Sequence, residues 1–344
     1  MEITISRESA VIQVSDATHS GEARRTAASF AERLSLGECA SSSLAIVVTE
    51  IATNMVKHAG SGTLLLDPIA YNGNRGMRVL ALDKGPGIKD LSTALRDGHS
   101  TTGTPGNGLG AIKRLSNVFD IHSSPGNGTA VMAEVWSQKI EKEKDGAVEV
   151  GVVSLPINGE EVCGDGWGFK EMPASILLMV VDGLGHGVLA AEAAREAERI
   201  FGEARSMSPT PILQDSHLSL KKTRGAAMAV ASLNFERGLL SYAGVGNISA
   251  SLVAPQGSRG LASHNGTVGH EVRNIQEFSL PWNAQSILVM HSDGLNTRWD
   301  LALYPGIWSK HPALIAGLLY RDFSRERDDV TVLVAKSRQE PDIA

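Results

Sequence analysis

The sequence predicts two successive α/β domains, at residues 1–137 and 147–338, joined by a linker at 138–146. Three observations support this fold class. The chain has 344 residues, which is enough for two domains of ordinary size. In both halves, short apolar runs typical of strands alternate with longer stretches of helical periodicity. Residues 137–146 are a charged run without a hydrophobic face, and the strand pattern restarts after them.

Composition excludes several classes of protein. The net charge is -6 and no basic cluster is present, which argues against nucleic acid as a partner. Cys39 and Cys163 have neither disulfide-framework nor zinc spacing, as is typical of the reducing cytoplasm. No apolar run approaches transmembrane length, and residues 1–14 do not resemble a signal peptide. We therefore expect a globular cytoplasmic protein that does not bind a membrane.

The first half begins with two short strands, 3–6 and 10–14, expected to pair as a hairpin. A helix over 16–36 follows, with Asp16 or Thr18 as N-cap and Gly37 as the C′ residue.

A second helix is predicted over 41–59. Glu50, Asn54 and His58 are spaced four apart in it, so they form a polar column on one face. A solvated face would explain the column, but asparagine is a poor helix former that gains nothing on an exposed surface.

Two glycine-rich segments follow in the same half. A strand pair, 63–71 and 75–82, ends in Asp83-Lys-Gly-Pro-Gly87. Residues 99–110 are rich in glycine and threonine and lead into a helix at 111–116. Such a loop at a helix N-terminus is a phosphate-binding arrangement, although a surface loop is the ordinary alternative. Strands at 118–122 and 129–136 complete the domain.

Four ordered motifs in residues 1–136 resemble those of the GHKL ATPases, whose fold is the Bergerat α/β sandwich. The motifs are Glu50-x3-Asn54-x3-His58, Asp83-x-Gly85-x-Gly87, the Gly106–Gly110 loop and Gly128-Thr129. Within that family they are most similar to the small anti-sigma-factor serine kinases, SpoIIAB-like and RsbT-like.

The resemblance implies ATP and Mg²⁺ as cofactors of this half. Asn54 would hold the Mg²⁺, and Glu50 would be the base that activates water or a substrate hydroxyl. Asp83 would bind the adenine amino group, with Thr129 behind it, and His58 would be a supporting residue. The remaining nucleotide-binding positions implied are Gly85, Gly87 and the lid glycines Gly106, Gly108 and Gly110.

The second half is organised around residues 176–187. An unbroken apolar run, 176–181, predicts a buried strand that carries Asp182 to its end. Three glycines follow within five residues, before a helix at 188–201. Further strands are expected at 148–155, before Asp165, and at 226–234, 238–245, 248–254, 272–280, 286–291 and 327–335, with helices at 211–220 and 312–322.

Four aspartates of this half lie at predicted strand ends: Asp165, Asp182, Asp293 and Asp328. Any one of them is more simply a turn residue. Four converging carboxylates would repel one another unless cations neutralised them, which predicts Mg²⁺ or Mn²⁺. Two metal ions about 4 Å apart would activate a bridging water for attack on a phosphate.

The order Gly-Asp-Gly, Asp-Gly-x-Gly-His-Gly, Ser-Asp-Gly, Asp-Asp-x-Thr resembles the 2C-type metal-dependent Ser/Thr phosphatases, and most closely SpoIIE-like and RsbX-like members. The resemblance spans about residues 148–336 and implies an α-β-β-α sandwich. It implies that Asp182 bridges two Mn²⁺ or Mg²⁺ ions, that the Gly183 carbonyl binds one of them, and that Asp293 and Asp328 hold the second. Asp165 would contact a metal directly or through water.

Three other positions have supporting or open roles. Asp329 is expected to support the site. His186 is either a proton donor or a turn-stabilising residue, and Asn247 is interpreted as structural. The strand before Asp165 offers no arginine to clamp the substrate phosphate.

Together the two resemblances predict a bifunctional regulator of a bacterial partner-switching pathway, which controls a stress response or a sigma factor. One half would phosphorylate a serine or threonine of a STAS-type antagonist protein, and the other would remove such phosphates. A sigma factor or a downstream phosphatase is a further candidate partner. Two alternatives are a nucleotide-sensing first half without kinase activity, and a catalytically inactive second half that serves as a scaffold.

Overall fold

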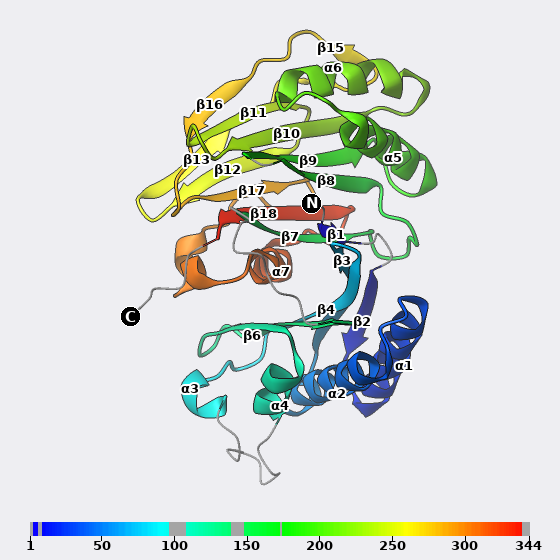
Figure 1. Ribbon diagram of the computed structural model, residues 1–344, viewed down its shortest axis with the longest axis vertical. Helices are drawn as coiled ribbons and strands as arrows, with labels where there is room; N and C mark the ends of the chain where they lie inside the picture. Colours follow the sequence, from blue (N-terminus) through cyan, green and yellow to red (C-terminus); the bar gives the residue numbers. More distant parts are fainter. Residues whose placement is uncertain (1–2, 6–8, 96–107, 139–147, 173, 339–344) are drawn as a thin grey trace. The chain divides into compact units, whose positions relative to one another are not determined.

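The computed structural model describes residues 3–5, 9–95, 108–138, 148–172 and 174–338. The chain forms two compact units. The N-terminal unit comprises Glu2–Lys144 and Tyr304–Arg321, and the C-terminal unit comprises Asp145–Leu303 and Asp322–Ala344 (Figure 1). The α/β fold class is confirmed. The predicted domain division at 138–146 remains a prediction, but residues 304–321 group with the N-terminal unit although they follow most of the second half in sequence.

The N-terminal unit contains a six-stranded antiparallel sheet of order β1-β3-β4-β6-β5, with β2 also paired to β3. Its strands are β1 (Ile3–Ile5), β2 (Ala10–Val14), β3 (Gly62–Tyr71), β4 (Asn74–Asp83), β5 (Val118–Ser123) and β6 (Thr129–Trp136). The expected hairpin of the first two strands is wrong, because β1 and β2 both pair with β3. The ten-residue β3 is long enough to accept one of them near each end.

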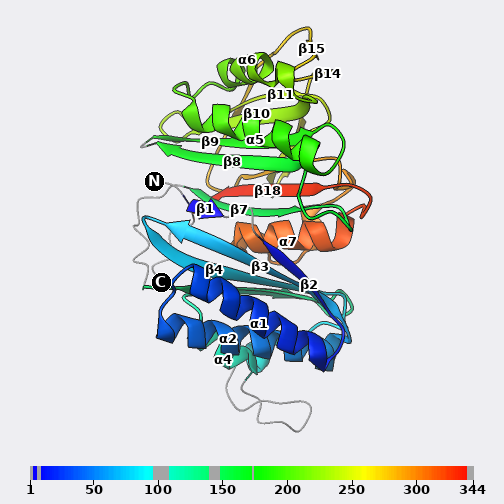
Figure 2. The same cartoon turned by 90° about the vertical axis from the view of Figure 1, so that its right-hand side faces the viewer.

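Helices α1 (Ala17–Arg33), α2 (Glu38–Asn54) and α4 (Gly108–Leu115) cover one face of this sheet (Figure 2). Asp16 caps α1, as predicted, by accepting hydrogen bonds from the N–H groups of Thr18 and His19. Gly37 is not the C′ residue of α1. Ser35 makes the left-handed turn after α1 with φ +54°, and Gly37, with φ +81°, is the N-cap of α2. A short helix, α3 (Leu91–Ala94), follows β4.

Alternate residues of the strands face these helices. Leu64, Val79 and Ala133 are among the buried residues of this core. The opposite face is also apolar and buried, with Leu80 and Leu82 at 1% and 2% exposure. Gly317 of helix α7 (Pro312–Phe323) lies against these two leucines, because a Cβ at Gly317 would lie 2.7 Å from Leu80 Cδ2 and 3.1 Å from Leu82 Cδ2. The glycine therefore permits the close packing of α7 on this sheet.

Helix α2 continues into a π-helix at Met55–Ala59. Together they form one helix, Glu38–Ala59, that is long and apolar enough by length and composition to cross a membrane, with a mean hydropathy of 1.4. The expectation that no run approaches this length is therefore wrong by this measure. The apolar residues Leu44, Val47, Val48 and Ile51 are buried in the core beneath the sheet, as in the core helix of a globular domain.

The C-terminal unit contains two five-stranded sheets that face one another (Figures 1 and 2). One has the order β16-β11-β10-β9-β8 and the other β13-β12-β17-β18-β7. The first contains β8 (Asp165–Met172), β9 (Ser175–Gly183), β10 (Ala226–Asn234), β11 (Leu239–Val245) and β16 (Phe278–Pro281). The second contains β7 (Val148–Leu155), β12 (Ser249–Ala254), β13 (Gly257–Leu261), β17 (Ile287–His291) and β18 (Val330–Ser337).

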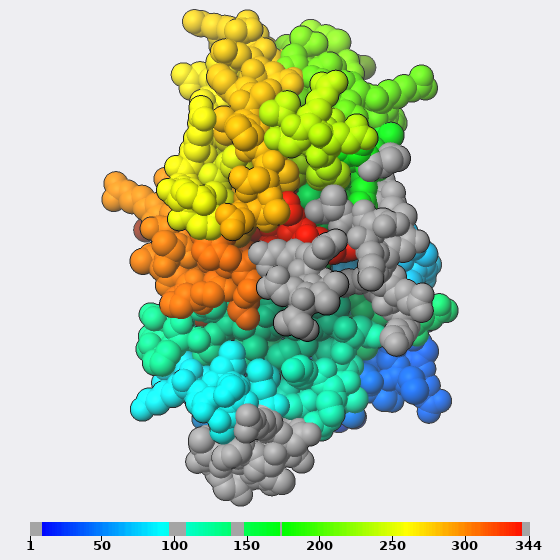
Figure 3. All heavy atoms as spheres, turned by 60° about the vertical axis from the view of Figure 1, so that its left-hand side comes forward, coloured from blue at the N-terminus to red at the C-terminus, as the bar shows by residue number. Residues whose placement is uncertain are grey.

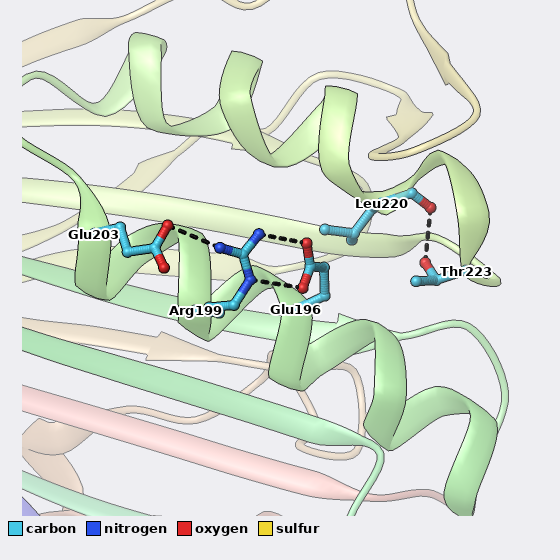
Figure 4. A network of polar contacts seen from close by, with 5 residues as sticks. All are labelled: Glu196, Arg199, Glu203, Leu220 and Thr223. Carbon is cyan, nitrogen blue, oxygen red and sulfur yellow. Dashed lines mark hydrogen bonds and ion pairs between the residues drawn. The ribbon is translucent and has the colours of Figure 1, made fainter.

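Helices α5 (Val188–Glu203) and α6 (Pro209–Ser219) cover the outer face of the first sheet. Arg199 of α5 pairs with both Glu196 and Glu203 along the helix surface (Figure 4). The single strand expected at 272–280 is instead two short ones, β15 (Glu271–Val272) and β16, and β14 (Gly266–Thr267) pairs with β15. Helix α7 groups mainly with the N-terminal unit.

Candidate active sites

Asp83, at the end of β4, is the centre of the predicted nucleotide site. Its Oδ1 accepts hydrogen bonds from the N–H groups of Gly85, at 2.8 Å, and Thr129, at 3.1 Å. Burial raises the pKa of this carboxyl, while these hydrogen bonds and the nearby Arg321 and His58 lower it. Both hydrogen bonds are accepted by Oδ1, so they fix the position of the carboxylate.

The glycines around Asp83 are required by close backbone approaches. At Gly128, with φ +70°, a Cβ would lie 2.0 Å from the Asp83 carbonyl oxygen. At Gly87, also with φ +70°, it would lie 2.1 Å from the Ser124 carbonyl oxygen, and at Gly85 it would lie 2.7 Å from Ala59. Only glycine fits at these three positions without displacing backbone.

Glu50 and Asn54 come together at the start of α4. A Cβ at Gly108 would lie 3.2 Å from Glu50 Oε2 and 3.3 Å from both side-chain atoms, Oδ1 and Nδ2, of Asn54. The helix N-terminus, with its free N–H groups, therefore lies beside the predicted base and the predicted Mg²⁺ ligand. Asn54 is also the last residue of α2 before the π-helix, a distortion that is frequent at functional sites.

The remaining predicted nucleotide residues are placed as follows. His58 is exposed within the π-helix and close enough to Asp83 to lower its pKa. Gly108 and Gly110 belong to α4, which begins three residues before the expected 111, and Gly110 is buried. Gly106 lies outside the described residues, as does most of the predicted loop at 99–110.

The four aspartates of the second half meet at one end of the C-terminal unit. Asp165 opens β8, rather than ending a strand as expected, and is the register partner of Asp182 near the end of β9. Along β9, Leu177, Met179 and Val181 face the helices. Asp182 therefore faces the opposite sheet, where Asp293 follows β17 and Asp328 precedes β18.

Repulsion among these carboxylates contributes to the shifts in their pKa values. Burial, followed by repulsion from Asp293 and Asp328, raises the pKa of Asp182 to about 7. Burial and the charge of Asp182 also raise the pKa of Asp165 well above its usual range. Burial and mutual repulsion disfavour the ionised form of these carboxylates. A bound divalent cation would stabilise that form.

Buried hydroxyl groups hold Asp165 in place. Ser292 Oγ donates to Asp165 Oδ2 at 2.6 Å, and Ser292 Oγ accepts from the N–H of Thr331 at 2.9 Å. His291 contacts the Ser292 carbonyl oxygen through Nδ1 and accepts a hydrogen bond at Nε2 from the Trp299 indole. The indole N–H is a donor only, so it assigns the proton of a neutral His291 to Nδ1.

Asp329 contacts the backbone of the segment before Asp165. Its two oxygens accept hydrogen bonds from the N–H of Ile157, at 2.8 Å, and of Gly164, at 2.9 Å. It therefore fixes the loop immediately before Asp165. The neighbouring Asp328 is exposed and accepts the N–H of Asp329 through Oδ1.

Gly183 is the last residue of β9, and His186 lies in the turn that follows it. A Cβ at Gly183 would lie 2.1 Å from the Ala190 carbonyl oxygen, so only glycine lets α5 approach this close. His186 is exposed, and its Nδ1 lies 2.7 Å from Glu160 Oε1. This contact ties the turn to the loop before Asp165.

Asn247 is the site residue that the sequence interpretation missed. Its Nδ2 donates to Asp293 Oδ2 at 2.8 Å, and its hydrogen bonding also lowers the pKa of Asp182. The signal was present in Gly244-x-Gly246-Asn247, a tight turn at the end of β11, which pairs with β10. Beside it lies an open hollow of about 360 Å³, lined by residues that include Asn247, Ser249, Gly260, Thr297 and Trp299.

The described residues contain no group of three or more His, Cys, Asp or Glu side chains arranged to hold a metal ion. The aspartates are therefore neighbours without forming a complete coordination sphere. Their type and number fit a hard divalent cation, since carboxylates and backbone carbonyls are its preferred ligands.

Comparisons with known proteins assign both halves. A family described as "Histidine kinase-like ATPase domain" matches residues 14–134, and "Stage II sporulation protein E (SpoIIE)" matches residues 173–338. Serine/threonine-protein kinase RsbT of Bacillus subtilis (strain 168) is 34% identical over 114 residues, which is 33% of this chain and 86% of RsbT. The chain is a fusion of these two families.

The chain is also similar to a second curated protein and to a solved structure. Phosphoserine phosphatase RsbX of Bacillus subtilis (strain 168) is 26% identical over 158 residues, which is 46% of this chain and 79% of RsbX. A solved structure described as "The bacterial stressosome: a modular system that has been adapted to control secondary messenger signaling" is 29% identical with a TM-score of 0.53. It covers 56% of this chain and 100% of that chain.

Proposed function

We propose that the fusion protein is a bifunctional enzyme of a bacterial partner-switching pathway in the cytoplasm. Its second half would hydrolyse phosphoserine or phosphothreonine on a STAS-type protein, and its first half would transfer phosphate from ATP to such a protein. The observation that carries the phosphatase proposal is the convergence of Asp182, Asp293 and Asp328 at one end of the C-terminal unit. Burial, followed by repulsion from Asp293 and Asp328, raises the pKa of Asp182 to about 7.

In the phosphatase site, the chain's own residues would hold and orient the reactants. Asp182, Asp293 and Asp328 would hold two Mn²⁺ or Mg²⁺ ions, with the Gly183 carbonyl and Asp165 as further ligands. Bound metal ions would supply a water of lowered pKa and neutralise charge on the phosphate. Asn247 orients Asp293, while Asp329 and Ser292 keep Asp165 and its loop in register.

In the kinase site, the position of Glu50 supports a role as the general base. Its Oε2 and the Asn54 amide lie together at the N-terminus of α4, which attracts phosphate oxygens. Asn54 would hold Mg²⁺, and Asp83 would bind the adenine amino group through Oδ2. Phosphoryl transfer requires mainly positioning and charge neutralisation, which these residues would supply.

Two opposing activities in one chain would cycle futilely unless one suppressed the other. We therefore propose reciprocal control, with ATP in the Asp83 pocket as the signal. The alternative is that the first half only senses ATP or holds a partner, and that it regulates an active phosphatase.

Two experiments test these proposals. A manganese-dependent phosphatase assay on a phosphoserine STAS-domain protein, with Asp182→Asn as control, tests the hydrolase. Activity that is equal in the wild type and the variant would remove the assignment to this site, and an inactive wild type would favour the scaffold alternative.

Transfer of label from radioactive ATP to the unphosphorylated STAS protein, with Asp182→Asn as background and Glu50→Gln as control, tests the kinase. ATP binding without label transfer would favour the sensing alternative. Phosphosite mapping of STAS-like proteins captured from the host would then identify the substrate.

A further inference from the structure

Arg224 lies at the same end of the C-terminal unit as the aspartates. It comes two residues before Ala226, which opens β10 and is the register partner of Gly183. The next pair along these strands joins Ala227 to Asp182. The neighbouring strand β11 ends one residue before Gly246-Asn247. Arg224 is therefore placed across the strand ends between Asp182 and Asn247.

The backbone on both sides of Arg224 is fixed by hydrogen bonds. Thr223 Oγ1 donates to the Leu220 carbonyl oxygen at 2.8 Å (Figure 4) and accepts the N–H of Gly225 at 3.0 Å. The Gly225 carbonyl oxygen accepts the N–H of Leu184, at 3.0 Å, in the turn after β9. The Arg224 carbonyl oxygen itself contacts Nε2 of His270 at 2.9 Å. The side chain therefore extends from a rigid point.

The guanidinium of Arg224 is directed at the turn that follows Asp182. A Cβ built at Gly185 would lie 3.0 Å from Arg224 Nη1, so the absence of a side chain at Gly185 makes room for this group. Arg224 is exposed, and in the described part of the chain its guanidinium forms no ion pair. The Arg224 guanidinium therefore lies beside the turn that follows Asp182 and is accessible to a ligand from solvent.

The chemistry of that ligand follows from its surroundings. A phosphate monoester carries two negative charges and would approach a cluster of carboxylates that repels it. Cations bound by the aspartates offset part of this repulsion, but the outer phosphate oxygens still need donors. Arginine meets this need with two parallel N–H groups that match the spacing of phosphate oxygens.

We propose that Arg224 binds the phosphate group of the substrate and supplies the clamp that the strand before Asp165 lacks. The ligand class is a phosphate monoester dianion or the inorganic phosphate product. This inference rests on the proposed phosphatase function, although phosphate binding itself does not require turnover.

The test compares Arg224→Ala and Arg224→Lys with the wild-type full-length protein in saturating Mn²⁺. Arg224→Ala should raise KM for a phosphoserine STAS protein and the inhibition constant of inorganic phosphate by about 10- to 100-fold, as expected for loss of a charged hydrogen bond. Arg224→Lys should recover part of this loss, because it keeps the charge without the fork. The activating Mn²⁺ concentration should not change.

Arg237→Ala is the matched control, since Arg237 is exposed and follows the opposite end of β10. It should leave KM and phosphate inhibition at wild-type values. Thermal melts of all variants separate loss of the fold from loss of binding. A KM and an inhibition constant within about twofold of wild type in Arg224→Ala, or a fall in kcat alone, would overturn the proposal.

Calorimetric titration of inorganic phosphate into the Mn²⁺-loaded protein separates this proposal from the proposed function. Phosphate binding by wild type that is lost in Arg224→Ala supports the clamp even if no turnover is found. Equal binding by both proteins, or no binding by either, contradicts it.

Discussion

The guanidinium of Arg321 donates a hydrogen bond from Nη1 to the backbone carbonyl oxygen of Asp83 at 3.0 Å. Burial raises the pKa of the Asp83 carboxyl, and the charge of Arg321 offsets part of that rise. Four residues later, the N–H of Arg325 donates to the carbonyl oxygen of Gly294, beside Asp293. The Arg321 hydrogen bond lies within the N-terminal unit, and the Arg325 hydrogen bond lies within the C-terminal unit. The two arginines are connected along the chain by residues 322–324. Residues 321–325 thus have a hydrogen bond at each of the two proposed sites.

Replacing Arg321 should therefore disconnect ATP from the phosphatase. In the wild type we expect saturating ATP to change the rate of phosphoserine hydrolysis by about 5-fold or more, as is typical of coupling between sites. In Arg321→Ala the rate with ATP should approach the rate without it. Phosphatase assays with and without ATP measure the effect, with Arg24→Ala, an exposed arginine of α1, as control. An unchanged ATP response in Arg321→Ala would contradict this role.

Asn247→Ala should weaken metal binding without removing a ligand. The substitution frees Asp293 Oδ2 from its 2.8 Å hydrogen bond and leaves the carboxylates less oriented. The Mn²⁺ concentration for half-maximal activity should rise by about 10- to 100-fold, as for other residues that orient metal ligands. Asn234→Ala, at the far end of β10, should leave the Mn²⁺ titration unchanged. Equal titrations for both variants would return Asn247 to a structural role.

The raised pKa of Asp182 predicts how metal binding depends on pH. Between 3.8, the unfolded value, and about 7, the folded protein retains a proton that the unfolded chain has released. In the metal-free protein, the contribution of Asp182 to the free energy of unfolding is therefore present at low pH and is lost as pH rises toward 7. Metal binding requires the ionised carboxylate, so the rise in Tm on adding Mn²⁺ should grow between about pH 5.5 and 8. Asp182→Asn should abolish this growth, and a Tm increase independent of pH would argue against the assignment.

Arg78 and Glu134 form a buried ion pair across β4 and β6, with Nη2 and Oε1 2.9 Å apart. Arg78→Met should destabilise the protein by about 3–5 kcal/mol, because it leaves Glu134 as an uncompensated buried charge. The double variant Arg78→Met/Glu134→Leu should recover most of this loss, since neither charge remains. Urea unfolding measures both. A single variant as stable as wild type would show that the pair contributes nothing.

The hollow beside Asn247 should accommodate part of a protein substrate. A Cβ at Gly260 would meet no atom within 4 Å, so Gly260→Phe can fill the hollow without strain in the fold. It should raise KM for a phosphoprotein while leaving hydrolysis of para-nitrophenyl phosphate unchanged. Gly202→Phe, at another open glycine near the end of α5, is the control. The hairpin of β12 and β13 that carries Gly260 is yellow in Figure 3.

Local pattern along the chain was enough for most of the fold and for the acidic residues. The strands β6, β7 and β10 have the predicted bounds, because apolar runs between turn residues define them without long-range information. Asp83, Asp182 and Asp293 could be predicted because they follow such runs. The glycines at 85, 87 and 128 were marked by motif, although only the close approach of backbone to each explains them.

Long-range pairing decided the rest. The partners of β1 and β2 depend on the length of β3. The role of Asn247 depends on the end of β11 lying at the same edge of the sheet as Asp182, with β10 between them, and on its contact with Asp293. The grouping of α7 with the N-terminal unit depends on the contact of Gly317 with Leu80 and Leu82, which precede it by 235 or more positions in the sequence. The local sequence indicates which residues can form a strand or a turn. The contacts on which the proposed roles of Asn247, Arg224 and Arg321 depend form only when segments that are distant in sequence come together in the fold.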